Sequence, residues 1–404
     1  MGKLRILQGG WRSPAVLMFV LTVAMAIGQG TYQALINNFA VERAAFTGQD
    51  IGFLHTIREV PGLLAFTVLF FLMFVREQRL AFVTLMVLGI GTAAVGYFPS
   101  AVGLWLTTLI SSLGFHYFEA IRQSLVMQWI DIKRAPLVLG RITAVNSFAS
   151  LGTFGAIFLL LRLVHLEYVP IYVIGGAVTF AIAAWAWIAF PRYDGGARQS
   201  RRLVLRPRYS LFYALTFLSG ARRIVISVFA GFLMVQKFGY DASAMTLMLL
   251  VNYGINVFLG ANVGRFIMRF GERRALMIEY VGIIFVFLGY AFVNDANVAV
   301  GLYVMDNVLF AMSISIRTYF QKIADPKDMA NTAGVSSTIN HIAAVFLPAV
   351  LGFVWMTSPA AVFLVGAGLA ACSLACIQMV PRNPAPGNEV NLFFRRRPAA
   401  TPAE

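Results

Sequence analysis

The segment "IRQSLVMQWIDIKRAPLVLGRITAVN" occupies residues 121–146, and a similar segment, "IRTYFQKIADPKDMANTAGVSSTIN", occupies residues 316–340. With one residue of slippage, the matched positions are Arg122 with Arg317, Asp131 with Asp325, Gly140 with Gly334, and Asn146 with Asn340. Shorter echoes keep a similar offset, such as "VREQRLA" at 75–81 and "FGERRAL" at 270–276. A long repeat in an apolar chain is typical of two stacked membrane bundles, the plan of many secondary transporters.

Composition indicates an all-α protein that crosses a membrane many times. Apolar residues make up 59% of the chain and charged residues only 12%, against about 25% charged in soluble domains. Because a helical span needs about 20 apolar residues, the sequence predicts twelve transmembrane helices in two pseudo-symmetric six-helix bundles. The predicted spans are 15–39, 50–75, 80–98, 101–130, 136–163, 169–190, 210–236, 243–270, 275–293, 298–322, 330–357 and 359–380.

The net charge of +15 is distributed unevenly along the chain. If the N-terminus is cytoplasmic, most Lys and Arg fall in cytoplasmic segments, and the opposite side holds only Arg43, Arg162 and Lys237. This bias predicts that both termini are cytoplasmic, in a multi-pass protein of the bacterial inner membrane. The expected partners of the basic surface are anionic lipid headgroups of the bilayer. Nucleic acid is not an expected partner.

The chain divides at its one long polar connection, "PRYDGGARQSRRLVLRPRYS" at 191–210. We expect an N-terminal bundle over 1–190, a basic cytoplasmic linker over 191–209, a C-terminal bundle over 210–381, and a disordered cytoplasmic tail over 382–404, because the tail is rich in Pro, Arg and Ala. We expect the protein to act as a monomer.

The second half carries a loop that resembles a family signature. The segment "GRFIMRFGERR" resembles the cytoplasmic pattern G-x-x-x-D-R-x-G-R-R of the major facilitator superfamily, with Met268 in place of the Asp and Glu272 before the two arginines. The matching residues are Gly264, Arg269, Gly271, Arg273 and Arg274. With two six-span halves and a basic central loop, the whole chain resembles this superfamily, although the motifs identify no subfamily. The resemblance implies a cavity between the halves, lined mainly by spans 1, 4, 7 and 10, and lipid-facing spans 3, 6, 9 and 12.

Charged residues within the spans are the main functional signal. Each costs about 2.5–3.5 kcal/mol to place at the bilayer centre, so each needs a reason to be there. We count eight, with a net charge of +2: Arg58, Glu59, Glu119, Arg122, Arg222, Arg223, Asp306 and Arg317. The excess of arginine favours an anionic or zwitterionic guest, because guanidinium groups bind carboxylate and phosphate through paired hydrogen bonds.

Polar side chains on the expected cavity-lining spans are the candidates for substrate binding. The superfamily often places a functional arginine in span 4, and the adjacent pair in span 7 lacks a carboxylate within four residues. Because adjacent residues point about 100° apart, only one of that pair can aim at the cavity, and the other pairs with Asp306 or another span. The alternative for all of them is a polar seam between helices. The candidates are Gln29, Tyr32, Gln33, His116, Arg122, Gln123, Arg222, Arg223, Asn252, Asn256 and Asp306.

Carboxylates in the spans are the candidates for proton coupling or gating. The carboxylates are Glu59, Glu119 and Asp306, and Arg58 is the neighbour of Glu59. Desolvation raises the pKa of a carboxylate, which favours proton binding, whereas a nearby arginine lowers that pKa and keeps the carboxylate charged. The alternative is a set of structural ion pairs that join neighbouring spans. Asn340 and His341 in span 11 are weaker candidates.

Cofactors and catalysis are not expected. The four histidines lie on separate spans or loops, and Cys372 and Cys376 lie one turn apart in the last span, so we expect no metal site. The chain has no Gly-rich phosphate loop, which argues against ATP as the energy source. We therefore do not expect an enzyme.

The sequence thus predicts a secondary active transporter for a small anionic or zwitterionic organic solute, coupled to protons, that works by alternating access. An alternative is a proton-driven exporter of drugs or amphiphiles, which the 35 Phe and 16 Met residues would suit. An alternative of another class is a transporter-like receptor or assembly factor that moves nothing.

Overall fold

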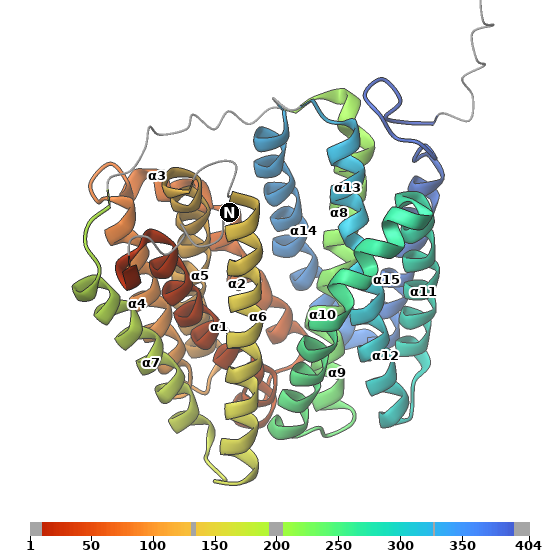
Figure 1. Cartoon of the computed structure of the whole chain (residues 1–404). Helices are drawn as coiled ribbons and strands as arrows, with labels where there is room; N and C mark the ends of the chain where they lie inside the picture. The colour runs from red at the N-terminus through yellow and green to blue at the C-terminus, as the bar shows by residue number, and fades with distance from the viewer. Residues whose placement is uncertain (1–9, 131–134, 194–204, 326–327, 392–404) are drawn as a thin grey trace, which may run out of the picture.

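The computed structural model describes residues 10–130, 135–193, 205–325 and 328–391, which fold almost entirely into helices (Figure 1). We call α1–α7 the N-terminal half. Its elements are η2 (Gly10–Arg12), α1 (Pro14–Ala44), α2 (Gly48–Leu63), η3 (Ala65–Thr67), α3 (Val68–Phe71), α4 (Glu77–Val95), α5 (Ala101–Trp129), α6 (Ala135–Arg162) and α7 (Tyr168–Ala189).

The elements from η4 to α15 make the C-terminal half. They are η4 (Pro207–Tyr209), α8 (Ser210–Val225), the π-helix η5 (Ile226–Ala230), α9 (Gly231–Gln236), α10 (Ala242–Phe270), α11 (Glu272–Phe292), α12 (Ala296–Phe310), η6 (Ala311–Ser313), α13 (Ile314–Ile323), α14 (Met329–Thr357) and α15 (Pro359–Gln378).

The helices match the twelve predicted spans. In the described part of the chain, eleven helical runs are long and apolar enough to cross a membrane, and the pair Gly48–Leu63 with Ala65–Phe71, bent by 43°, makes the twelfth if it counts as one span. The bend follows Pro61, which lies inside α2 and cannot donate a backbone hydrogen bond. The fold is therefore the predicted all-α membrane architecture.

Polar side chains start many of the helices. Ser13 caps α1 before a proline at its first position, and Thr47 forms a reciprocal capping box with Asp50 at the start of α2. The side chains of Asp241 and Asp295 accept backbone N–H groups at the starts of α10 and α12. These caps satisfy backbone donors that the first helical turn leaves free, so short loops are enough to reverse the chain.

The two faces of the bundle differ in how the halves meet. We call the face where α1 begins and α15 ends the termini face, and the opposite one the distal face (Figure 1). One hydrophobic core unites both halves on the distal side, including the later part of α1 together with η5, α9 and the start of α10. Toward the termini face each half has cores of its own. The halves are therefore joined distally and packed separately toward the termini face.

The seam between α2 and α14 joins the halves on the distal side. A Cβ placed on Gly52 would lie 2.4 Å from the carbonyl oxygen of Pro348, so only glycine permits this approach. Thr56 donates to the Val345 carbonyl at 2.7 Å and accepts from the Ala349 N–H at 3.2 Å. Because these contacts involve main-chain atoms of α14, the facing positions of α2 can hold only small side chains when the two helices are in contact.

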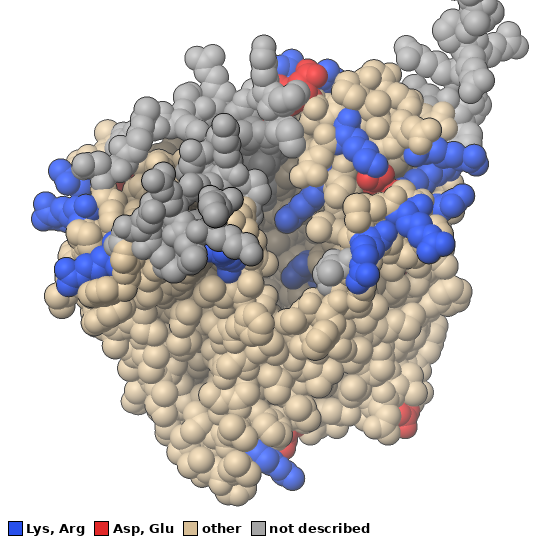
Figure 2. All heavy atoms as spheres, viewed as in Figure 1, with Lys and Arg blue, Asp and Glu red and all other residues tan. Residues whose placement is uncertain are grey.

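A hollow lies between the halves and opens toward the termini face (Figure 2). Lys and Arg atoms are visible within it, whereas the outer walls of the bundle in this view are almost free of charged residues. The conformation is therefore closed at the distal face and open at the termini face.

The tail differs in part from the prediction of disorder over 382–404. Residues 382–391 fold back onto the C-terminal half, where the hydroxyl of Tyr319 donates to the Glu389 carbonyl at 2.5 Å and the Asn391 N–H donates to the Met379 carbonyl at 2.7 Å. Val390 packs against the apolar core there. The sequence did not predict these contacts, because most of them involve backbone atoms, which a composition rich in proline does not reveal. The rest of the predicted tail lies outside the described residues.

Candidate functional site

Arg222 and Arg223 lie in the last turn of α8, just before the chain widens into the π-helix Ile226–Ala230. Such π-helical turns inside a helix are frequent at functional sites. Adjacent residues of a helix point about 100° apart, so the two guanidinium groups leave α8 in different directions. Their surroundings differ accordingly.

Arg222 is sealed inside the C-terminal half. It is 1% exposed, and its Nη2 lies 2.5 Å from Oε1 of Glu279, which is fully buried on α11. Its guanidinium also lies over the Tyr280 ring, 4.7 Å from the centroid. In this conformation Arg222 is the member of the pair that contacts another span, as expected of one of the two arginines, but its carboxylate partner comes from a span that we expected to face lipid. That Arg222 binds substrate stays a prediction.

Arg223 is exposed although it lies in the middle of its span. Its guanidinium stacks over the ring of Phe310, 4.3 Å from the centroid, and no hydrogen bond or ion pair joins it to another described residue. The nearest charges that act on it include Asp306 and Glu59.

Asp306 faces the same region from α12. It precedes Phe310 by one helical turn, so the two share a face of the helix. The carboxylate is half-exposed, feels the charges of Arg222 and Arg223, and makes no hydrogen bond or ion pair within the described residues. At 1.5 Å per residue, Asp306 lies ~15 Å from the start of α12 and Arg223 ~20 Å from the start of α8. Both residues are thus near mid-depth.

A histidine–carboxylate cluster joins the halves at a similar depth. Glu59 of α2 contacts Nδ1 of His341 of α14 at 3.2 Å, and the His341 ring lies 5.1 Å from that of His116 of α5. Gly62 makes room for both rings, because a Cβ there would lie 2.4 Å from Cε1 of His341. Arg58 flanks Glu59, with 3.8 Å between Nε and Oε1.

The sequence placed these histidines on separate spans, and only the fold brings them together. Among the described residues, no group of three or more His, Cys, Asp or Glu has the geometry to hold a metal ion. The cluster instead offers a carboxylate that is shared between the two halves.

The candidates on α5 pair with one another. Arg122 donates to Oε1 of Glu119 at 2.7 Å, and Nε2 of Gln123 donates to the same oxygen at 3.4 Å. Arg122 also reaches Oγ1 of Thr22 on α1 at 3.5 Å. In this conformation these side chains form a local network between α1 and α5.

The candidates on α1 line a small cavity inside the N-terminal half. Gln29 and Tyr32 face it together with Arg58. Tyr32 is buried and exchanges a hydrogen bond with Thr108 at 2.9 Å, and the Arg58 guanidinium lies 5.9 Å from its ring centroid. Gln33 is half-buried. Tyr32 thus helps to hold Arg58 in place.

The amides of α10 pair across to α12. Asn256 and Asn307 exchange side-chain hydrogen bonds at 3.1 and 3.3 Å, and Asn307 also donates to the Asn252 carbonyl at 3.3 Å. Asn252 is buried. Asn307, which the sequence offers beside Asp306 on span 10, thus joins α12 to α10.

The count of charges within the spans changes once their surroundings are known. Arg317 is exposed six residues before the end of α13 at the termini face, so it lies outside the mid-depth set to which Arg223 belongs. Glu279 joins the set as the buried partner of Arg222. The charges that remain are balanced: Arg58, Arg122, Arg222 and Arg223 against Glu59, Glu119, Glu279 and Asp306. The predicted net charge of +2 is therefore corrected to zero.

The signature-like loop forms the turn between α10 and α11. Gly271 has a φ of 83°, which glycine adopts without strain, and Arg273 donates to Oε1 of Gln378 at 2.9 Å. Arg269 lies at the end of α10, beside the ring of Phe270, and Gly264 is half-buried one and a half turns earlier. The contacts of this loop stay within the C-terminal half among the described residues.

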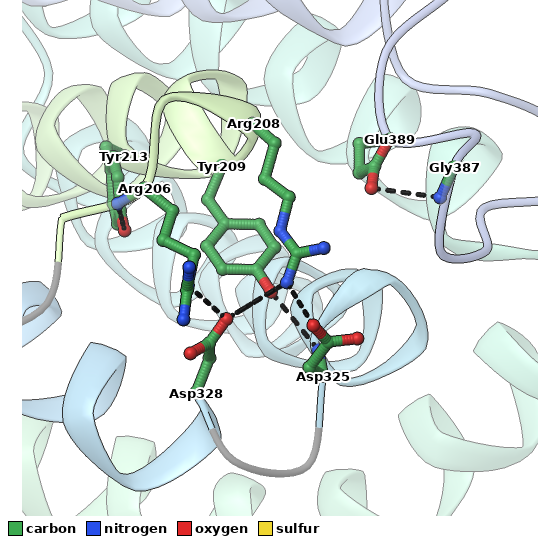
Figure 3. A network of polar contacts seen from close by, with 8 residues as sticks. All are labelled: Arg206, Arg208, Tyr209, Tyr213, Asp325, Asp328, Gly387 and Glu389. Carbon is green, nitrogen blue, oxygen red and sulfur yellow. Dashed lines mark hydrogen bonds and ion pairs between the residues drawn. The ribbon is translucent and has the colours of Figure 1, made fainter.

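A second polar network holds the start of α8 at the termini face (Figure 3). Asp328 pairs with Nε of Arg206 at 2.6 Å and with Nη2 of Arg208 at 3.0 Å, and the Tyr209 hydroxyl donates to it at 3.0 Å. Hydrogen bonds from Arg206 and these neighbours hold the pKa of Asp328 below its usual value, although burial opposes them. The network includes Asp325, whose repeat counterpart Asp131 lies outside the described residues.

Comparison with known proteins agrees with this architecture. The profile of the Major Facilitator Superfamily matches residues 18–348. No curated protein matches the sequence significantly. The solved nucleoside transporter NupG superposes with a TM-score of 0.72 at 13% identity, covering 90% of this chain and 98% of that one. A bacterial homologue of the human lysosomal transporter Spinster, inward-facing and occupied, gives 0.71 at 11% identity, covering 91% and 96%. At these identities the likeness shows a shared fold.

Proposed function

The chain belongs to the Major Facilitator Superfamily, and we propose that it is a secondary active transporter for a small anionic or zwitterionic organic solute. The solute binds in the hollow between the halves near mid-depth. The two halves then rock about this site, so that it opens to one face of the membrane and then to the other.

Arg223 is the observation that carries this proposal. A guanidinium near the middle of a span is costly, yet this one is exposed and has no carboxylate in contact among the described residues. A guest carboxylate or phosphate would supply the missing partner through charge-assisted hydrogen bonds. Stacking on Phe310 leaves the edge of the guanidinium available for such bonds.

Orientation follows from the distribution of basic residues. We propose that the termini face is the cytoplasmic face of the inner membrane, because Lys and Arg concentrate there and are sparse on the distal face (Figure 2). The hollow then opens to the cytoplasm, and the structure represents an inward-facing state.

Proton coupling would use the carboxylate that the halves share. Glu59 contacts His341 across the interface, so the transition to a distally open state must separate these two groups. Protonation of Glu59 would weaken this contact and favour separation. We therefore expect Glu59→Gln to uncouple transport from the pH gradient, and Glu119→Gln to test the second carboxylate near the hollow.

Flux into proteoliposomes tests the transport proposal. Purified protein is reconstituted, and uptake of a panel of radiolabelled carboxylates, phosphonates and amino acids is measured with and without a pH gradient. We expect Arg223→Gln to lower uptake of the substrate by about tenfold or more, the loss of one charge-assisted pair. Arg317→Gln is the matched control, because this arginine is exposed away from the mid-depth site.

Failure of every panel member to move, with folded protein in the liposomes, would contradict the transport proposal. Equal uptake by the Arg223 variant and the control would contradict the anchoring role of Arg223. Uptake that keeps its full dependence on the pH gradient in both glutamate variants would remove those carboxylates from the coupling mechanism.

A further inference from the structure

The balance of charges in the bundle narrows the chemistry of the guest. Arg222 is neutralised by Glu279, and Arg122 by Glu119. Glu59 lies against Arg58 and His341. Near mid-depth, these contacts leave two charged groups that have no ion pair among the described residues, namely Arg223 and Asp306.

These two opposite charges face each other across one seam. The Arg223 guanidinium stacks on Phe310, and Asp306 lies one turn away on the same face of α12. Each feels the charge of the other, yet their charged atoms are more than 4 Å apart, since no ion pair forms. Both are at least partly exposed. The two side chains therefore present opposite charges to one region without neutralising each other by direct contact.

A guest with a single negative charge would satisfy only half of this arrangement. It would pair with Arg223 and leave the Asp306 carboxylate near mid-depth without an ion pair, beside a second negative charge and with only the longer-range attraction of Arg222. An uncompensated charge in a low-dielectric site is costly. A guest that carries both an anionic group and an ammonium group would neutralise both residues at once.

We propose that the seam between α8 and α12 is a zwitterion-binding site, in which Arg223 binds a carboxylate or phosphate of the guest and Asp306 binds its ammonium group. This inference rests on the proposed transport function and selects one of its two substrate classes. Phe310 forms the apolar wall beneath the Arg223 guanidinium.

The amide pair of Asn256 and Asn307 extends the site from α12 toward α10. Both residues pack between α10 and α12, and Asn307 follows Asp306 directly in sequence. Tyr253 and Tyr303 feel the charges of Arg223 and Asp306, respectively. Neutral polar groups of this kind bind the uncharged part of a guest without changing the charge balance.

Binding of charge-matched probes tests this site directly. The probes are ω-aminoalkanoates from β-alanine to 6-aminohexanoate, each compared with the alkanoate and the alkylamine of the same chain length. Affinity for the full-length purified protein is measured by calorimetry. For at least one chain length we expect the zwitterion to bind about tenfold or more tightly than either singly charged analogue, as the second charge-assisted pair requires.

Variants that remove one charge test which residue binds the carboxylate of the probe and which binds its ammonium group. Asp306→Asn should reduce binding of the zwitterion to the level of the alkanoate, and Arg223→Gln should reduce it to the level of the alkylamine. Asp306→Glu, which keeps the charge, should restore part of the preference. Asp295→Asn is the matched control on the same helix, because Asp295 caps the start of α12 and asparagine caps helices equally well.

Three results would overturn the inference. One is an alkanoate that binds as tightly as its matched zwitterion at every length. Another is unchanged zwitterion binding in Asp306→Asn. The third is that no zwitterion binds better to the wild-type protein than to the double variant of Arg223 and Asp306. Flux in proteoliposomes separates this failure from that of the proposed function: Arg223-dependent uptake of singly charged anions alone would leave transport intact and remove only the zwitterion site.

Discussion

The buried pair of Arg222 and Glu279 allows a quantitative test of how this bundle tolerates charge. Both side chains are at most 1% exposed, so removal of either one leaves the other charged and without water. Such a change typically costs about 3–5 kcal/mol. We therefore expect Arg222→Met and Glu279→Leu, each alone, to lower the free energy of unfolding by about that amount. We expect the double variant to recover most or all of it.

We expect the double variant to recover stability because two polar atoms of the Arg222–Glu279 pair lack hydrogen-bond partners in the described part of the chain. Nε of Arg222 and Oε2 of Glu279 are buried without a hydrogen-bond partner among the described residues, so the pair recovers its desolvation cost only in part. Replacement of similar buried pairs by apolar residues ranges from neutral to stabilising by about 1–4 kcal/mol. Unfolding by SDS in lipid bicelles measures the four free energies of this double-mutant cycle.

Transport by the double variant completes the test. If Arg222 is structural, the double variant should keep uptake within about threefold of the wild-type protein, a change of under 1 kcal/mol. Single variants that cost less than 1 kcal/mol would refute the claim that the pair is sealed. A stable double variant that no longer transports would show that Arg222 itself serves the substrate and is not purely structural.

Three further outcomes are expected. Gly52→Ala should favour the distally open state about tenfold, as spin-label distances between the halves would report, because overpacking costs about 1–3 kcal/mol; Gly368→Ala, with open space around it, is the control. Asp328 should hold the start of α8 above pH 4 and release it as pH falls through its lowered pKa. The hydrogen-exchange protection factors of η4, which correct for the intrinsic exchange rate at each pH, should fall over this range in the wild-type protein and stay constant in Asp328→Asn. Gly62→Ala should separate His341 from Glu59 and weaken the pH dependence of uptake.

Much of the fold was predictable because the membrane leaves few choices. Backbone groups in lipid must be satisfied within a helix, so apolar length alone located the spans and the repeat predicted two halves. Breaks inside spans were partly visible: Pro61 marked the bend after α2. The π-helix after Arg223 and the 3-10 turn after Phe310 had no such sign, because their sequences contain neither Pro nor Gly.

The candidate site was predictable in its residue types and not in its pairings. Arg223 and Asp306 stood out as charges inside apolar runs, and the structure places both at one seam. The partner of Arg222 was missed, because Glu279 lies 57 residues further along the chain on a span assigned to lipid. Contacts over such separations depend on how helices rotate and pack, which no local pattern in a single sequence records.

The histidines are a second case in which the sequence did not predict a contact between distant residues. His55, His116 and His341 lie on three spans and offered no reason to expect one cluster, yet the fold brings His116 of α5 and His341 of α14 into ring contact. Gly62 is what permits it, although a lone glycine in an apolar helix does not by itself indicate a close approach. Small residues decide how closely two helices approach, so they decide which polar groups meet across a seam.

Counting charges therefore misleads unless their partners are known. The sequence contained an excess of arginine within the spans, which favoured an anion, but that excess vanished at mid-depth because Arg317 lies toward the termini face and Glu279 is a buried partner of Arg222. What matters to a guest is the residual charge after each sealed pair is removed. That residual charge is one guanidinium and one carboxylate at a shared seam, and a transporter that keeps both open near mid-depth offsets their cost only if its substrate neutralises both.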